Sequence, residues 1–444
     1  MKKMFYMLLV AMATTLLGGC FGKGTSADPP TNFMAVAGDG RVILTWDPVP
    51  SVDFWIFTAT NPGLTAFNWT GLPNAHAYIH AATPYYMCGL YYGSQYYFAA
   101  NGRTNGGPGG ASSPTINAIP YNASAGTWTT GTTSPAPNLL GVGYTSLTTC
   151  SNNTTSAAGT FAAVGASGAI FTSPDGITWT NQSTPAGFAT DLYAVTGYAA
   201  NQNNPTTPNL HWVAVGDAGG SVYSTDGITW TIGGASTLTS QPLRSITQSA
   251  GRFIAVGDAG TILSSTDGNT WTSHSATSGT TNNLNGVTHG TYFVAVGDSG
   301  TIVTSVDGYT WTLKTSITPD ISSISLRQVA YHGSIIVAVG DSGTIVTSKD
   351  NGATWTSQTP FGTPNLVGVA AETQVVENAV ADPQLGYIAT AQFVAVDSNG
   401  NTYTSQNGFD WSASNNTGIS TNSLVSSGFG YVSAGNAGAI SYAF

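Results

Sequence analysis

Charge and cysteine are both scarce in this sequence. Only 7% of its 444 residues are charged, and 10 lysines and arginines stand against 20 aspartates and glutamates, for a formal net charge of −10. Nucleic acid is therefore excluded as an expected partner, because binding its phosphates requires clustered basic side chains. Long apolar runs are also rare. The longest, from Met4 to Leu17, falls short of the roughly 20 residues that cross a bilayer.

That apolar run has the features of an export signal. It follows Lys2 and Lys3 and ends in Leu17-Gly18-Gly19-Cys20. A charged start, a short apolar stretch and small residues before a cleavage point are typical of secretory signals. The last four residues resemble the bacterial lipobox. The resemblance implies removal of residues 1–19, a lipid on Cys20 that holds the protein to a membrane, and, because Phe21 follows, an outer-membrane lipoprotein facing the periplasm or the cell surface. An ordinary secretory signal with an incidental cysteine is the alternative.

The remaining two of the three cysteines are Cys88 and Cys150. An exported protein meets conditions that permit disulfides, so the two thiols are a possible pair. Spacing alone does not decide between a bridge and two separate small residues, and both readings stay open.

Residues 30–121 are expected to form a β-sandwich, preceded by a small polar tether at 20–29. Alternating apolar and polar residues over Arg41–Trp46 predict a strand, and Asp53–Thr58 and Tyr96–Asn101 predict two more. Composition and length therefore favour a small all-β domain before the rest of the chain.

Two features of this segment resemble fibronectin type III domains. Trp46-Asp47-Pro48 closes an early strand, and Tyr96 lies six residues after Leu90, as in the tryptophan strand and the tyrosine corner of that family. We expect this domain to serve as a spacer between the membrane anchor and the rest of the chain.

Residues 125–444 repeat a unit of about 40 residues, a period typical of propeller blades. Each unit has an apolar strand, a segment like VAVGDxGTI, a turn of the form Ser-x-Asp-Gly-x-Thr-Trp and a polar connection. Six units are complete, and a seventh is divided between residues near Trp128 and the stretch 424–444. The sequence thus predicts an all-β chain with a seven-bladed β-propeller whose last blade is closed by a strand from its beginning.

Each recurring residue of the repeated turn has a structural reason. Its aspartate can accept hydrogen bonds from backbone amides, its glycine supplies an unusual backbone angle, and its tryptophan packs between blades. These turns resemble the Asp-box (BNR) repeats of sialidase-like propellers, with Asn407 replacing the aspartate before Trp411. Together with the VGDxGTI segments they are most similar to the propellers of photosystem II assembly and stability factors. The predicted structural pairs are Asp175 and Trp179, Asp226 and Trp230, Asp267 and Trp271, Asp307 and Trp311, and Asp350 and Trp355.

The sequence offers no catalytic constellation. Sialidases hold a carboxylate with three converging arginines, but only Arg244 and Arg327 begin innermost strands here, whereas Arg252 begins a second strand and is expected at the opposite end. Glu372 and Glu377 lie in a long connection and are expected to be solvated. We therefore expect no enzyme and no cofactor, with a degenerate sialidase-like glycan-processing enzyme as the alternative.

A metal site is not expected either. Asp217, Asp258, Asp298 and Asp341 recur in the turn between the second and third strands, and adjacent sheets stand about 10 Å apart, too far for neighbouring copies to share a calcium ion. We expect these aspartates to cap their turns. The histidines lack metal-ligating neighbours in the sequence; they include His76, His80, His289 and His332.

Two surfaces are candidates for binding. In the assembly-factor relatives an arginine patch on the propeller binds a client protein, and Arg244 and Arg327 are the only two positions here that can carry a remnant of that patch. The alternative is a pair of channel-mouth charges bonded to backbone carbonyls. Long connections at 146–160, 199–211 and 371–391 are expected on the opposite face. The sequence predicts a non-catalytic envelope lipoprotein whose propeller binds a protein client or a glycan; a purely structural envelope component is a further alternative.

Overall fold

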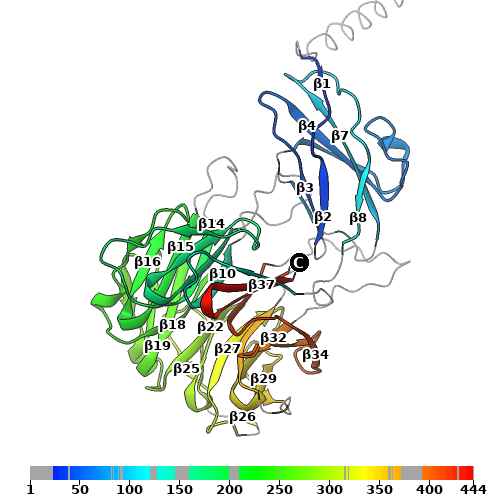
Figure 1. Ribbon diagram of the computed structural model, residues 1–444. Helices are drawn as coiled ribbons and strands as arrows, with labels where there is room; N and C mark the ends of the chain where they lie inside the picture. The colour runs from blue at the N-terminus through cyan, green and yellow to red at the C-terminus, as the bar shows by residue number, and fades with distance from the viewer. Residues whose placement is uncertain are drawn as a thin grey trace, which may run out of the picture. The chain divides into compact units, whose positions relative to one another are not determined.

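The computed structural model shows an all-β chain with short 3-10 turns (Figure 1). The described residues up to 120 form one compact unit, and those from 128 onward form another. Within the described part of the chain, no helix is long and apolar enough to cross a membrane. The structure describes residues 24–38, 41–81, 83, 85–88, 90, 94–120, 128–145, 160–199, 210–249, 251–314, 317–318, 320–358, 362, 364–371, 393–427 and 430–443.

The first unit contains two sheets in its described residues. One has the order β1-β7-β4-β5, with β8 also paired to β7, and the other has the order β2-β3-β6. The strands are β1 (Ser26–Ala27), β2 (Met34–Gly38), β3 (Arg41–Thr45), β4 (Asp53–Ala59), β5 (His76–Ala81), β6 (Tyr85–Cys88), β7 (Tyr96–Arg103) and β8 (Ile116–Ala118).

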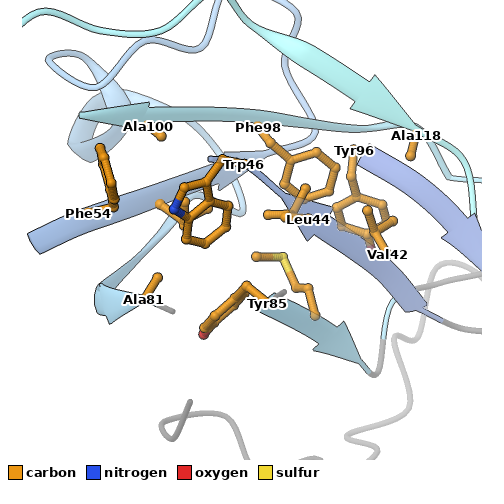
Figure 2. Packing of buried hydrophobic residues seen from close by; sticks show 12 residues of the cluster. Val42, Leu44, Trp46, Phe54, Ala81, Tyr85, Tyr96, Phe98, Ala100 and Ala118 are labelled. Atoms are coloured by element: carbon orange, nitrogen blue, oxygen red, sulfur yellow. The ribbon is translucent and has the colours of Figure 1, made fainter. Parts of the chain in front are cut away.

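Alternation along these strands builds a common core between the two sheets (Figure 2). Leu44 on β3 and Ile56 on β4 are fully buried, and each contributes about 1.5–3 kcal/mol by leaving water. Trp46, just after β3, meets Phe33 and Phe54 edge to face, both with ring centroids 6.1 Å away. The tryptophan singled out in the sequence is therefore a core residue.

The second unit contains seven sheets among its described residues, numbered here one to seven in chain order. Sheet one contains β10 (Leu139–Thr145), β11 (Thr160–Gly165), β12 (Ile170–Ser173) and β13 (Thr180–Gln182); sheet two contains β14 (Leu192–Ala199), β15 (Leu210–Gly216), β16 (Ser221–Ser224) and β17 (Thr231–Ile232); and sheet three contains β18 (Leu243–Ser249), β19 (Arg252–Gly257), β20 (Ile262–Ser265) and β21 (Trp271–Ser273). Sheet four contains β22 (Leu284–His289), β23 (Phe293–Gly297), β24 (Ile302–Ser305) and β25 (Thr312–Leu313), and sheet five contains β27 (Leu326–His332), β28 (Ile335–Gly340), β29 (Ile345–Ser348) and β30 (Trp355–Ser357), with β26 (Ile317–Thr318) outside β30. Sheet six contains β31 (Leu366–Ala371), β32 (Phe393–Asp397), β33 (Asn401–Ser405) and β34 (Ser412–Asn416), and sheet seven contains β35 (Thr421–Ser426), β36 (Tyr431–Gly435), β37 (Ala439–Ala443) and β9 (Thr129–Thr132).

The first strands of these sheets form a ring. Each contacts the first strand of the next sheet, and β35 of sheet seven contacts β10 of sheet one (Figure 1). Sheet seven is completed by β9, which pairs antiparallel with β37 so that Thr129 lies opposite Tyr442. This arrangement is a β-propeller, as the repeats predict.

The turn after each second strand has a left-handed pair of residues in every sheet except sheet six. In sheet three Thr261 N donates to Asp258 O over 3.1 Å, and the two central residues, Ala259 and Gly260, have φ of 54° and 68°. Two successive positive angles define the tight turn that suits twisted antiparallel strands. A Cβ on Gly260 would lie 2.2 Å from Thr280 O, so glycine is required there.

The residue before several first strands ties neighbouring sheets together. Asn138 Oδ1 accepts a hydrogen bond from Ala437 N over 2.9 Å, which links sheet seven to sheet one. Asp191 Oδ1 accepts one from Ser167 N over 2.8 Å, which links sheet one to sheet two. The same bond recurs between Asn283 and Ala259 and between Asn365 and Ser342. These side chains hold the left-handed residue of one sheet against the next.

Candidate functional site

A ring of polar side chains lies where the first strands begin. In sheet three the Arg244 guanidinium binds both carboxylate oxygens of Asp258, with Nη2 2.9 Å from Oδ2. In sheet five Arg327 binds Asp341 in the same way, with both distances 2.9 Å. A bulge immediately around each arginine, between Leu243 and Ser245 in sheet three, turns this side chain toward the following turn.

Asparagines occupy the equivalent position in two other sheets. Asn285 Nδ2 donates to Asp298 Oδ1 and to Leu326 O of the next sheet, both over 2.9 Å. Asn422 Nδ2 donates to Asn436 Oδ1 over 2.9 Å. We call this set the turn rim. Its members are Tyr193, Asp217, Arg244, Asp258, Asn285, Asp298, Arg327, Asp341, Asn422 and Asn436.

Two sequence interpretations need correction here. Asp258, Asp298 and Asp341 were expected to cap their own turns, but their carboxylates bind neighbouring side chains. The alternative interpretation of Arg244 and Arg327 named backbone carbonyls as their hydrogen-bond acceptors. The acceptor is a carboxylate in both cases, so that part of the interpretation is wrong. A signal for these pairs was present, because the same separation of 14 residues joins arginine to aspartate in both sheets.

Hydrogen bonds within the rim favour the charged forms of Arg244, Arg327 and Asp298. The hydrogen bond to Asp258 raises the pKa of Arg244, although burial acts in the other direction. Burial tends to raise the pKa of Asp298, but hydrogen bonds from Asn285, Ser325 and Asn283 lower it overall. Burial and the nearby Asp217 raise the pKa of Tyr193, so its phenol stays neutral. With four aspartates and two arginines, the rim is net acidic at neutral pH.

The other end of the propeller carries the repeated turns. In sheet three Asp267 Oδ1 accepts hydrogen bonds from Asn269 N and Thr270 N over 2.8 and 2.7 Å. Trp271 Nε1 donates to Gly268 O over 3.0 Å. The aspartate thus holds its own backbone through Oδ1. The same two amide bonds are accepted by Asp175, Asp226 and Asp307, and Asp350 accepts one, from Thr354 N.

The asparagine variant of this turn keeps the same geometry. Asn407 Oδ1 accepts hydrogen bonds from Phe409 N and Asp410 N over 2.8 and 2.9 Å. An amide oxygen therefore replaces the carboxylate at this position without loss of the two bonds.

The tryptophans of these turns pack between sheets. Trp311 of sheet four contacts a cluster that contains Ile254 and Val256 of sheet three. Trp230, Trp271, Trp311 and Trp355 are buried, whereas Trp179 is only partly buried. Their role is therefore structural.

Arg252 lies at the end of the repeated turns. Its Nη1 donates to Asp307 O, and its guanidinium carbon lies 4.2 Å from the centre of the Tyr309 ring. Arg244 and Arg327 belong to the turn rim instead, so the three arginines of the propeller do not form one anion site.

No group of three or more histidine, cysteine, aspartate or glutamate side chains suited to a metal ion occurs within the described ranges. His80 Nδ1 pairs with Asp53 Oδ2 over 2.9 Å in the first unit, where His76 begins β5. His289 packs on Phe293, and burial lowers its pKa. His332 ends β27.

Several predictions fall on residues that the structure does not describe. Cys20, Cys150, Glu372 and Glu377 lie outside the described residues, as does most of the three long connections. Cys88 ends strand β6, and its side chain is likewise outside the description. The lipid, the disulfide and the second binding face stay predictions.

Asp397 is a residue that the sequence analysis missed. It replaces the glycine that precedes the turn in other sheets, is buried, and accepts hydrogen bonds from Asn399 N and Asn401 N, both over 2.9 Å. Sheet six therefore closes this turn with a side chain where the others use a left-handed pair.

Comparison with known proteins agrees with this fold. Residues 206–322 match a family described as a DUF6242 beta propeller domain. None of the curated proteins matches the sequence. A structure of YCF48 bound to D1 peptide is 16% identical, with a TM-score of 0.51, and the alignment covers 73% of this chain and 96% of that one.

Two further structures are similar. YCF48 from Cyanidioschyzon merolae is 14% identical over 71% of this chain and 98% of its own, with a TM-score of 0.50. Selenomethionine-substituted virginiamycin B lyase from Staphylococcus aureus is 10% identical, with a TM-score of 0.53, and the alignment covers 71% of this chain and 98% of that one. At these identities the similarity establishes the β-propeller fold.

Proposed function

We propose that this chain is a non-catalytic bacterial envelope lipoprotein whose seven-bladed Asp-box propeller binds a protein client at the turn rim. A fibronectin type III-like sandwich links that propeller to a lipid on Cys20. The observation that carries the proposal is the turn rim itself, where half-exposed Arg244 and Arg327 are held in fixed positions by bidentate carboxylates. Polar groups that are oriented in advance lose less conformational entropy when a partner binds.

The architecture supports the finer assignments. Seven sheets in a ring and the repeated Ser-Asp-Gly-Trp bonding pattern are what an Asp-box propeller requires. Sheets of order β2-β3-β6 and β1-β7-β4-β5 around a buried Trp46 fit a fibronectin type III-like sandwich. A structure of YCF48 contains a bound D1 peptide, which favours peptide binding for this similar propeller.

The contacts of the propeller arginines favour binding over catalytic turnover. Both rim arginines already neutralise a carboxylate, and Arg252 is engaged with Asp307 and Tyr309 at the other end. Because the rim is net acidic, we expect a client surface that presents basic or neutral polar groups.

Site-specific photo-crosslinking in cells tests the client site. Replacing Tyr193, a half-buried rim residue, with p-benzoylphenylalanine places a reactive group beside Arg244 and Asp258. We expect one discrete protein adduct after illumination. The matched control puts the same group at Tyr309, an exposed tyrosine at the opposite end. Equal adducts from both positions, or none from Tyr193, would remove the turn rim from consideration.

Lipid attachment is tested separately. Metabolic labelling with radioactive palmitate should label the wild-type chain and not Cys20→Ala, because the proposed lipid is attached only to that thiol. Protease treatment of intact cells, with a periplasmic protein as leakage control, then distinguishes the cell surface from the periplasm. Labelling of the Cys20→Ala variant would contradict the lipoprotein assignment.

A further inference from the structure

The outer edges of the propeller sheets differ in how they are covered. The last strand of a sheet exposes backbone groups along one side, and such an edge readily accepts another extended chain. Sheet five shows this within the protein itself. The segment β26 pairs parallel with β30, placing Ile317 opposite Trp355 and Thr318 opposite Thr356, and the Ile317 side chain packs against the cluster around that tryptophan.

Sheet two has the same edge without a fifth strand in its described residues. Its order is β14-β15-β16-β17, so β17 is terminal. Trp230 and Thr231 are the counterparts of Trp355 and Thr356. The positions that receive β26 in sheet five therefore have direct equivalents here.

The backbone of β17 is oriented for such pairing. Gly233 N donates to Ser221 O over 2.8 Å, which makes these two residues a hydrogen-bonded pair across the hairpin. In antiparallel strands such pairs alternate, so the N–H and C=O of the preceding residue, Ile232, point away from β16. In sheet five Gln358 N donates to Ile345 O in the same way, and β26 lies on the outer side.

Three exposed aliphatic side chains lie in β17 or close to it in the sequence. Ile228, Ile232 and Leu238 are 64%, 43% and 45% exposed. The residues at the Ile232 position of other sheets are mostly small or polar: Asn181, Ser273, Ser357, Ala413 and Thr130. Leu313 of sheet four is also apolar, but it is only partly exposed and packs against a core cluster.

Charge does not protect this edge. From Gly227 to Leu243 the sequence contains no aspartate, glutamate, lysine or arginine. Natural sheet edges are commonly protected from pairing by lysine, proline or a bulge. An exposed aliphatic edge without charge is instead typical of a surface that another polypeptide covers.

We propose that the outer edge of sheet two binds an extended, uncharged peptide segment of a partner protein. The segment adds as a fifth strand parallel to β17, as β26 does on β30, and places a β-branched or aliphatic side chain beside Ile232. This site is separate from the turn rim and does not depend on the client proposed there.

Peptide selection on the full chain tests the site. A phage library of random twelve-residue peptides is selected on wild-type protein and counter-selected on Ile232→Lys, which adds charge at the centre of the edge. We expect enrichment of extended sequences with alternating β-branched residues and without proline. Synthetic versions of the enriched peptides should bind wild type at least about tenfold more tightly than Ile232→Lys, a difference of about 1.4 kcal/mol.

Matched variants separate this site from others. Ser273→Lys makes the equivalent change in sheet three, and Arg244→Ala with Arg327→Ala removes both rim cations; neither should weaken the selected peptides. Ile228→Ser is a second, milder edge variant and should weaken them too. Hydrogen exchange should show slower exchange of the Ile232 amide when peptide is bound, because that N–H becomes bonded.

Three outcomes would overturn the proposal. The library could fail to enrich, the peptides could lose affinity equally with Ser273→Lys, or their binding could depend on Arg244 and Arg327. Concentration-dependent dimers that disappear in Ile232→Lys would identify a second copy of this chain as the occupant in place of a partner peptide.

Discussion

The two ends of the propeller use the same residue type in opposite ways. At the end of the repeated turns, Asp267 accepts hydrogen bonds from its own backbone amides and supports a buried tryptophan. At the turn rim, Asp258 of the same sheet binds the side chain of Arg244, which is 40% exposed. One carboxylate holds its own backbone, and the other holds in place an arginine side chain that a partner can reach.

The largest expected effect concerns the tryptophans at the structural end. Trp271 packs with Val213 and Val215 of the preceding sheet, so Trp271→Ala should lower the free energy of unfolding by about 3–5 kcal/mol. Urea denaturation followed by circular dichroism measures it. Tyr309→Ala, an exposed aromatic at the same end, is the control and should cost far less. If both variants lose a similar free energy of unfolding, burial of the tryptophan between sheets is not the cause of the loss.

The two aspartates of sheet three test the comparison directly. Asp267→Ala removes the acceptor of two exposed backbone amides and should cost about 0.5–2 kcal/mol, as the loss of a capping side chain does. Asp258→Ala breaks a half-exposed ion pair, for which about 0.2–1 kcal/mol is expected. Both values come from the same denaturation experiment. If Asp258→Ala proves the more destabilising, the distinction between the two ends is wrong.

Acid should act mainly at the structural end. Hydrogen bonds from Thr310 N and Tyr309 N lower the pKa of Asp307. Burial opposes the same effect at Asp226 and Asp267, but the amide bonds still lower the pKa of both. A carboxyl whose pKa is lower in the folded state stabilises fully above its unfolded value, near 3.8, and this stability is lost as pH falls through the folded pKa.

Asparagine substitutions measure that acid dependence. The triple variant Asp226→Asn, Asp267→Asn, Asp307→Asn copies Asn407 and should unfold with a weaker dependence on pH below about 4, because the amide does not titrate. Acid titration monitored by tryptophan fluorescence checks it. An unchanged slope would mean that other carboxyls govern acid unfolding.

The smallest expected effect lies in the turns that support the rim. Ala259 has φ of 54°, which costs an L-residue roughly 1–2 kcal/mol, whereas glycine adopts it freely but loses about 0.5–1 kcal/mol of entropy. Ala259→Gly should therefore change thermal stability little, with a net gain below about 1 kcal/mol. Ala255→Gly, in strand β19, should be destabilising. A clear loss from Ala259→Gly would show that the methyl group has contacts that matter.

The propeller was predictable because each unit repeats a complete set of local signals. Glycine, aspartate and tryptophan occur at fixed offsets, and strand, turn and burial follow from neighbours close in sequence. Arg244 illustrates what the repeats do not predict. Its partner lies 14 residues away, across a bulge and a turn. The same spacing recurs in sheet five, but the spacing alone does not decide between this carboxylate and a backbone carbonyl as the acceptor.

Sheet six illustrates the same point. Asp397 breaks the VAVGD pattern, and only its hydrogen bonds in the structure show that its side chain holds the turn. Likewise, β26 covers the edge of sheet five although its sequence is merely part of a polar connection. Contacts between segments that do not repeat were the ones that sequence reasoning could not supply.

The seam between β9 and β37 also dictates an order of events during synthesis. Ser441 Oγ donates to Thr129 O across 312 residues of chain. A ribosome that adds about 5–20 residues per second leaves β9 waiting some tens of seconds for its partner. During that interval the blade cannot close, so we expect the growing chain to be most vulnerable to proteases and mispairing until the last strand emerges.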